Sequence, residues 1–255
     1  DRSCQDHIFS FTSVVGNRLQ NNQETFAAFI DLRKAFDYVN RDLMFYKMLL
    51  NHIDGNFYLA IKALYGKTLS CVKLDNMYTD WFETYSGVRQ GDCMSPTLFA
   101  IFINDLISHL NSLECGISVD DTNICSLLYA DDIVLFTENE SKLQILLNHL
   151  HDWCTKWQLQ INIEKSNVMH FRKKTSRLTP KRFNIGENEL SKVDKYKYLG
   201  IVLNENMDYN VTVDVLACSA GRALGSVINK FRQLKNMGYN TYTKLVDSSV
   251  FPIME

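Results

Sequence analysis

The chain has 255 residues, of which 46% are hydrophobic, and its formal net charge is −2. A chain of this length buries a sizeable core and is about two domains long by the usual length prior. No run approaches the roughly 18 uninterrupted apolar residues of a membrane-spanning helix, so we expect no membrane association. The weakly acidic total argues mildly against a nucleic-acid partner, although the distribution of charge matters more than its sum.

The cysteines do not form a recognisable framework. There are seven, scattered along the chain without a C-x-x-C pair. This spacing suggests neither a zinc cluster nor a compact set of disulfides. We therefore expect reduced thiols in an intracellular protein, in either the nucleus or the cytoplasm.

In the first half of the chain, hydrophobic patterning predicts three elements. Residues 25–30 read TFAAFI and predict a short buried strand, and residues 41–50 read RDLMFYKMLL and predict a helix. Residues 95–110 read SPTLFAIFINDLISHL and predict a buried helix, with Ser95 as its N-cap and Pro96 in its first turn.

The second half adds a helix, strands and a helical end. Apolar residues recur at spacings of three and four across residues 143–157, which predicts a helix lying on a sheet. Residues 159–171 and 195–203 predict strands, and residues 211–250 return to a helical, more basic composition. We place the domain boundary near residue 205, giving domains 1–204 and 205–255.

Residues 127–136, LLYADDIVLF, place two aspartates between apolar runs. A two-residue hairpin loop favours Asn-Gly or Asp-Gly, so Asp131 and Asp132 are a poor choice for a turn alone. A solvated surface turn is one interpretation. The other is that divalent cations balance the paired charge, since hard cations take oxygen ligands. Asp31 ends the first predicted strand and could supply a further carboxylate, whereas Asp37 lies beyond that strand and could instead cap the next helix.

Five segments carry a family resemblance in their order along the chain. They are FAAFIDLRKAFDYVNRDLM, SGVRQGDCMSPTLFAIFINDLI, LLYADDIVLF, WQLQINIEKSNVMHF and YKYLGIVL. Together they resemble successive sequence blocks of reverse transcriptases, most closely those of non-LTR (LINE-type) retrotransposons. The resemblance implies an α+β fold with a right-hand palm and partial fingers over residues 1–204 and a helical thumb over 205–255, in which the thumb is incomplete.

The resemblance also implies a catalytic set. Asp31 and Asp131 match the principal metal ligands, and Asp132 matches the third catalytic carboxylate of a Mg²⁺ site at which Mn²⁺ is an alternative. Lys165 matches a lysine near the triphosphate, although residue type alone would favour a solvated surface lysine. The expected chemistry is two-metal nucleotidyl transfer from a deoxynucleoside triphosphate to a primer 3′-hydroxyl.

Four further residues are expected to bind substrate. Phe36 matches the bulky residue that excludes a 2′-hydroxyl, and its alternative is an ordinary core phenylalanine. Gln90 and Gly91 match the block that lines the incoming nucleotide and template, where Asp92 departs from the usual family pattern. Arg33, just past the catalytic strand, is a reserve candidate for holding the triphosphate.

The expected partners are an RNA template and a DNA primer, and the sequence predicts no oligomeric state. Two other functions stay open: an inactive or domesticated nucleic-acid-binding remnant, and a metal-dependent nuclease, which would need further carboxylates or histidines. Before Asp31 the chain offers only Arg2 and Arg18 as cations for a triphosphate, so we expect weak polymerisation without an upstream portion of the fingers.

Basic residues concentrate late in the chain. Residues 165–182 hold seven Lys or Arg and no Asp or Glu, which is typical of a phosphate-binding surface or of a solvated basic loop. The terminal helices add cations as a thumb holding a duplex would, namely Arg222, Lys230, Arg232, Lys235 and Lys244.

Overall fold

The computed structural model describes residues 3–233 and 238–254, so that the predicted cations Arg2 and Lys235 lie outside it. The chain divides into two compact units, Asp1–Val193 and Asp194–Glu255. The hairpin over residues 195–204, which we had placed with the first domain, groups with the second unit. Each unit is described below by itself.

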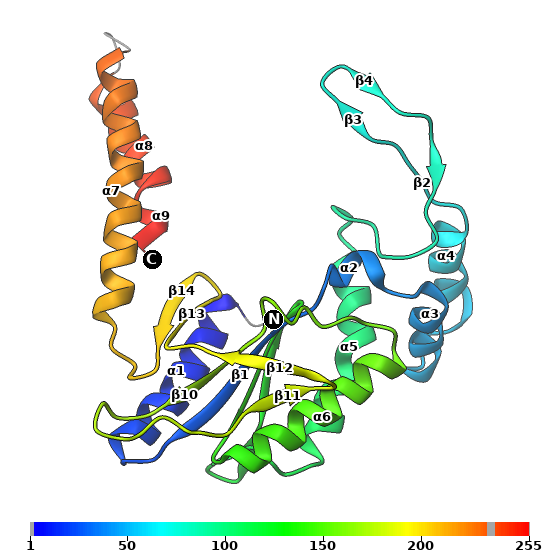
Figure 1. Cartoon of the computed structure of the whole chain (residues 1–255). Coiled ribbons are helices and arrows are strands. Elements are labelled where there is room, and N and C mark those ends of the chain that lie inside the picture. Colours follow the sequence, from blue (N-terminus) through cyan, green and yellow to red (C-terminus); the bar gives the residue numbers. More distant parts are fainter. Residues whose placement is uncertain (1–2, 234–237, 255) are drawn as a thin grey trace. The chain divides into compact units, whose positions relative to one another are not determined.

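A six-stranded sheet forms the centre of the first unit (Figure 1). Neighbouring strands are antiparallel, apart from the parallel pair β10 and β12. In spatial order the strands are β11 (Phe183–Ile185), β12 (Asn188–Lys192), β10 (Asn167–Phe171), β1 (Thr25–Asp31), β9 (Asp132–Thr137) and β8 (Ser126–Tyr129).

Helices cover both faces of this sheet. On one face, Phe11 of α1 (Cys4–Gln20) packs edge-on against Phe29, Phe136 and Phe171. On the other face, alternate residues of β1 join the core formed with α5 (Ser95–Asn111) and α6 (Glu140–Lys156). Because β1 is buried on both sides, its sequence is an uninterrupted apolar run and not an alternating one.

The segment between β1 and α5 forms a helical layer and an arm. It begins with α2 (Ala35–Tyr38), α3 (Arg41–Leu50) and α4 (Gly55–Gly66). Figure 1 shows the next short strands at the base and tip of an arm that extends away from α4. These strands are β2 (Leu69–Ser70), β3 (Lys73–Leu74), β4 (Met77–Tyr78) and β5 (Phe82–Glu83). After α5, the strands β6 (Ile117–Val119) and β7 (Thr122–Ile124) form another small hairpin.

The second unit begins with a hairpin and continues as helices. The hairpin pairs β13 (Lys195–Tyr198) with β14 (Ile201–Asn204), followed by α7 (Asn210–Gln233), α8 (Tyr239–Ser249) and α9 (Phe251–Met254). Within the described residues, α7 is long and apolar enough to cross a membrane by length and composition alone, which is weak evidence for a span. The sequence has no uninterrupted apolar run over α7, because charged residues such as Asp214 and Arg222 lie within it.

Most predicted elements are confirmed, including α3 with its predicted bounds and the apolar stripe of α6. Two expectations are wrong in detail. Ser95 is not the N-cap of α5: Met94 holds that position, and the Ser95 hydroxyl donates to the Arg89 carbonyl at 2.5 Å. The predicted strand over 159–171 is a strand only from Asn167, because residues 160–166 turn beside the end of β1.

Candidate active site

Residues 129–132, here called the YADD segment, place one aspartate in a turn and the other in a strand. Asp132 is the first residue of β9, while Ala130 and Asp131 form the two-residue turn that joins β8 to β9. Ala130 has a φ of 53°, in the left-handed region that L-residues rarely occupy. A strained non-glycine turn persists only where the surrounding structure enforces it, and such turns cluster at functional sites.

Asp132 lies directly opposite Asp31 in the antiparallel register of β9 and β1. Strand alternation puts Asp31 on the same face as Phe29, and Asp132 on the same face as Phe136, which is the face covered by Phe11. Directly opposed residues have Cβ atoms about 4.5–5.5 Å apart. The fold therefore brings Asp31 and Asp132 together across 100 residues of sequence, with Asp131 in the adjoining turn.

The three carboxylates influence one another electrostatically. Partial burial raises the pKa of Asp132 above its usual value, and the negative charges of Asp131 and Asp31 raise it further. Carboxylate oxygens are the ligands that Mg²⁺ prefers, so the donor set fits such an ion chemically. Among residues 3–233 and 238–254, however, no three His, Cys, Asp or Glu side chains gather tightly enough to hold a metal ion in this conformation.

Asp31 is held in place by the turn that precedes β10. The Asn162 side-chain amide donates to Asp31 Oδ2 at 3.0 Å, and the Asn162 backbone N–H donates to the Asp31 carbonyl at 2.9 Å. The Asp31 N–H donates to the hydroxyl of the buried Ser166 at 3.1 Å. We did not predict Asn162 or Ser166 as site residues. Lys165 belongs to the same turn and has an exposed side chain, so the fold brings it to the Asp31 end of the sheet.

Arg33 and Phe36 follow β1, the strand that ends at Asp31. The Phe36 ring stacks on Phe99 with centroids 4.7 Å apart, and its outer side lines a cavity of about 790 Å³ that also contacts Tyr129 and Ala130. Phe36 is thus partly a packing residue and partly exposed beside the YADD turn. Arg33 is exposed, and its backbone N–H donates to the Gln160 carbonyl at 2.7 Å.

Gln90 is fixed by Asp37. The Gln90 side-chain amide donates to Asp37 Oδ1 at 2.8 Å, and Gly91 next to it has a φ of 83° with open space where a Cβ would stand. Asp37 does not cap α3: Asn40 does, by accepting from the backbone N–H groups of Asp42 and Leu43. The rival carboxylate of the sequence analysis therefore positions the predicted substrate-binding glutamine.

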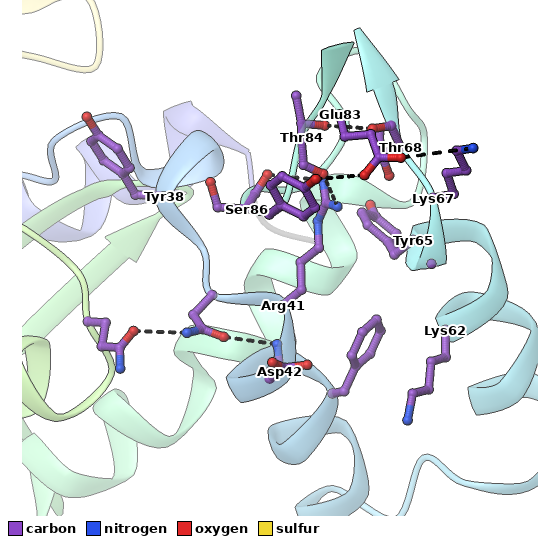
Figure 2. Close-up of a pocket in the computed structure, with 15 residues that line it drawn as sticks. Tyr38, Arg41, Asp42, Lys62, Tyr65, Lys67, Thr68, Glu83, Thr84 and Ser86 are labelled. Atoms are coloured by element: carbon purple, nitrogen blue, oxygen red, sulfur yellow. Dashed lines mark hydrogen bonds and ion pairs between the residues drawn. The ribbon is translucent and has the colours of Figure 1, made fainter.

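Arg41 anchors the loop that carries Gln90 to this region. Its guanidinium donates to three carbonyls, those of Thr84 at 2.7 Å, Ser86 at 3.0 Å and Gly87 at 2.9 Å, and it lies over the Tyr65 ring. Figure 2 shows Arg41 reaching toward Thr84 and Ser86 in a polar pocket. None of Asp31, Asp131 and Asp132 lines this pocket, so it lies apart from the predicted catalytic carboxylates.

Gly87 lies close against the backbone of α2. Its φ is 81°, and an added Cβ would lie 2.7 Å from the Asp37 carbonyl oxygen and 2.9 Å from the Phe36 carbonyl oxygen. Gly87 and Val88 donate backbone hydrogen bonds to Val39 and Phe36. Sequence reasoning missed both Arg41 and Gly87, although a glycine three residues before Gln90 was a signal for such an approach.

The basic residues named in the sequence analysis do not all lie at the Asp31 end of the sheet. Arg18 donates to the Thr25 hydroxyl and the Glu24 carbonyl, at the opposite end of β1 from Asp31. The cationic run after Phe171 starts at that same end, because Phe171 pairs with Thr25. Lys165 lies at the Asp31 end of β10, whereas the run from Arg172 starts at the other end and returns along the sheet to β11, where Phe183 pairs with Leu190. One phosphate-binding face over residues 165–182 stays a prediction.

Comparisons with known proteins identify the family of this chain. The family described as reverse transcriptase (RNA-dependent DNA polymerase) matches residues 1–203. The chain is 27% identical over 198 residues to the RNA-directed DNA polymerase from mobile element jockey of Drosophila melanogaster, covering 75% of this chain and 21% of that protein. It is also 27% identical over 205 residues to the Pol polyprotein of the retrotransposable element R2DM of the same species, covering 78% of this chain and 19% of that protein.

Solved structures give the same fold. Apo telomerase from Candida tropicalis, truncated from its C-terminal domain, superimposes with a TM-score of 0.52 at 15% identity, covering 80% of this chain and 39% of that chain. Telomerase from Candida albicans gives 0.51 at 14% identity, covering 88% and 39%. The expected α+β reverse-transcriptase fold is confirmed. The chain spans about a fifth of the length of these two curated relatives. It belongs to the reverse transcriptase family in the form found in non-LTR retrotransposons.

Proposed function

We propose that this chain carries the polymerase active site of a retroelement and performs RNA-templated DNA synthesis. The reaction is attack of the primer 3′-hydroxyl on the α-phosphate of a deoxynucleoside triphosphate, with pyrophosphate as the leaving group. The observation that supports it best is the direct pairing of Asp31 with Asp132 across two strands, with Asp131 in the strained turn beside them.

Asp31, Asp131 and Asp132 are the residues that would hold Mg²⁺ or Mn²⁺ in a two-metal site. Bound divalent ions neutralise phosphate charge and activate the attacking oxygen. Asn162 positions Asp31 through its 3.0 Å hydrogen bond to Oδ2. A fixed carboxylate matters because preorganised charge needs no rearrangement during the reaction.

The remaining roles concern the nucleotide and template. Phe36 excludes a 2′-hydroxyl from its position beside the YADD turn, and Gln90 with Gly91 lines the nucleotide and template. Lys165 donates a proton to pyrophosphate or neutralises its charge, and Arg33 contacts the triphosphate. Both cations have exposed side chains at the end of the sheet where Asp31 lies.

In this proposal residues 1–204 form the palm with partial fingers, and residues 205–255 form the thumb. The partners are an RNA template, a DNA primer and deoxynucleoside triphosphates, inside the cell. Within the described residues the seven cysteines are free, which is also the common state of thiols in intracellular proteins.

The test is primer extension on a defined RNA template with Mg²⁺. Asp131→Asn keeps the side-chain shape but removes the charge, so nucleotide addition should fall by orders of magnitude while primer–template binding is kept. Asp152→Asn, at an exposed position on α6, is the matched control and should extend normally. Near-normal extension by Asp131→Asn would contradict the proposal. Nucleic-acid binding without any extension by the unaltered chain would support the alternative of an inactive remnant.

Phe36→Val isolates the sugar contact. Removing the outer part of the ring should raise incorporation of ribonucleotides relative to deoxynucleotides by relieving a steric clash. The ratio of the two kcat/KM values is the measurement. An equal fall for both substrates would show that Phe36 acts only through its packing on Phe99.

A further inference from the structure

The loop between β10 and β11 carries a dense run of positive charge. We call residues 172–182 the basic loop. It contains six Lys or Arg and no Asp or Glu, namely Arg172, Lys173, Lys174, Arg177, Lys181 and Arg182. Lys173, Lys174 and Arg177 are exposed. A concentration of exposed cations in a chain of net charge −2 needs an explanation that the active site does not provide.

The basic loop starts at the end of the sheet that is remote from the catalytic carboxylates. Strand β10 runs antiparallel to β1, with Asn167 opposite Phe29 and Phe171 opposite Thr25. The loop therefore leaves the sheet beside Thr25, whereas Asp31 ends β1 at the other side. Six residue steps along β1 span about 20 Å. At this separation the root of the loop is too far away to hold the triphosphate of a nucleotide at Asp31.

Buried contacts fix the second half of the basic loop. Thr179 is 5% exposed, and its hydroxyl donates to the Glu140 carboxylate of α6. Its backbone N–H donates to Nδ1 of the buried His170 at 3.2 Å. The Lys192 ammonium donates to the Thr179 carbonyl at 2.9 Å and to the Lys181 carbonyl at 3.2 Å. Three elements of the sheet and its helical layer thus hold this half of the loop.

The first half is fixed near its start. Arg172 Nη1 donates to the Ser176 carbonyl at 2.9 Å, and the Lys173 ammonium donates to the Asn22 side chain that follows α1. Arg182 lies 3.4 Å from the Glu189 carboxylate, so part of its charge is balanced within the protein. A loop held at several points presents its exposed cations with little further loss of conformational entropy on binding.

We propose that the basic loop binds the phosphate backbone of nucleic acid at a site separate from the polymerase centre. Regularly spaced phosphates match several exposed cations on a fixed scaffold, and release of condensed counterions drives such binding. A membrane surface fits less well, because Leu178 is the large apolar side chain that the loop exposes, and interfacial binding normally buries an apolar face. RNA and DNA share the backbone chemistry, so both are used as probes.

The first test removes two exposed charges. Lys174→Gln with Arg177→Gln is compared with Lys62→Gln with Lys156→Gln, an equal charge change at exposed positions on α4 and α6. Binding of a labelled RNA hairpin and of a DNA duplex of equal length is measured by fluorescence anisotropy from 50 to 200 mM salt, without nucleotide. For the DNA duplex, loss of two phosphate contacts should reduce the slope of log K against log salt by about 1.8, which is about a twelvefold difference across that salt range.

The second variant keeps every charge. Thr179→Val removes the hydroxyl contact to Glu140, so it should weaken binding while leaving the salt slope unchanged. Thermal unfolding checks that each variant is folded. Loss of affinity for RNA, DNA or both assigns the nucleic acid that the loop binds.

Two results would overturn the proposal. One is a salt slope and an affinity that are unchanged in the double variant. The other is that the basic loop binds anionic phospholipid vesicles but neither nucleic acid. Extension of a short primer–template by the double variant should keep its kcat, because Lys174 and Arg177 lie between Phe171 and Thr179, both of which are held at the Thr25 end of the sheet and not at Asp31. Failure of the polymerase assignment would leave the binding result intact, so the two proposals can fail separately.

Discussion

A lysine is buried among aromatic rings where α3, α5 and α6 meet. The Lys47 side chain is 2% exposed, and its ammonium donates to the Phe102 carbonyl at 2.5 Å and to Asp105 Oδ1 at 2.6 Å. The same nitrogen lies 3.7 Å from the ring centroid of Trp157 and 4.3 Å from that of Trp153. The carboxylate and the rings stabilise the charge, but removal from water opposes it more strongly.

The balance predicts how stability depends on pH. Burial lowers the pKa of Lys47 from 10.5 to about 8, and the contact with Asp105 offsets only part of this effect. Between pH 8 and 10.5 the unfolded chain therefore binds more protons at this residue than the folded chain. The free energy of unfolding should rise with pH across that window, by roughly 3 kcal/mol in total from this residue, at about 1.36 kcal/mol per pKa unit.

The variant Lys47→Met keeps most of the side-chain volume and removes the titrating group. When the pH is raised from 8 to 10.5, the free energy of unfolding of the unaltered chain should increase by roughly 3 kcal/mol relative to that of Lys47→Met. Urea unfolding followed by tryptophan fluorescence at fixed pH values measures it. Lys62→Met, at an exposed position on α4, should show no such change. A difference independent of pH for Lys47→Met would refute the assignment of a depressed pKa to this residue.

Three further predictions concern the active site. Gly87→Ala should destabilise the fold and lower nucleotide addition, because the new Cβ would push against the Phe36 carbonyl; thermal unfolding and primer extension measure the two effects. Asp132→Asn should raise the melting temperature in EDTA by relieving repulsion from the neighbouring carboxylates while abolishing extension, and an unchanged melting temperature would count against that repulsion. Asn162→Ala should lower kcat by about tenfold with little change in the melting temperature, because Asp31 loses the 3.0 Å contact that orients it.

The sequence was sufficient for the elements that carry the carboxylates. Patterning predicted the strand ending at Asp31, the helix over 41–50 and the apolar stripe of α6, because in each case the burial of one or both faces determines the residue types. The motif order predicted that Asp31 and the aspartate pair belong to one site. The antiparallel register that sets Asp31 opposite Asp132 is a long-range pairing, which local patterns do not encode.

The supporting residues could not be found in this way. Arg41 is the first residue of α3 and reads as an ordinary surface cation, yet it donates to three carbonyls more than 40 positions away in the sequence. Asn162 sits in a segment whose apolar alternation suggested a strand, but hydrogen bonding to the end of β1 turns it. The basic run over residues 165–182 is continuous in sequence, and only the direction of β10 shows that Lys165 and Arg172 lie at opposite ends of that strand.

The arrangement around the YADD turn opposes stability locally, and the surrounding core offsets it. Ala130 occupies a left-handed conformation, which is unfavourable by about 1 kcal/mol or more. Asp132 is partly buried beside two other carboxylates, which disfavours its charged form. On the strand that carries Asp31, both faces are buried, by Phe11 on one side and by the α5 and α6 layer on the other. Because this packing fixes the strand ends, the carboxylates stay close together despite their repulsion, and a bound cation would remove that repulsion. The clustered carboxylates therefore lower the stability of the fold without a metal ion, and the same cluster is what suits the site to binding a divalent ion.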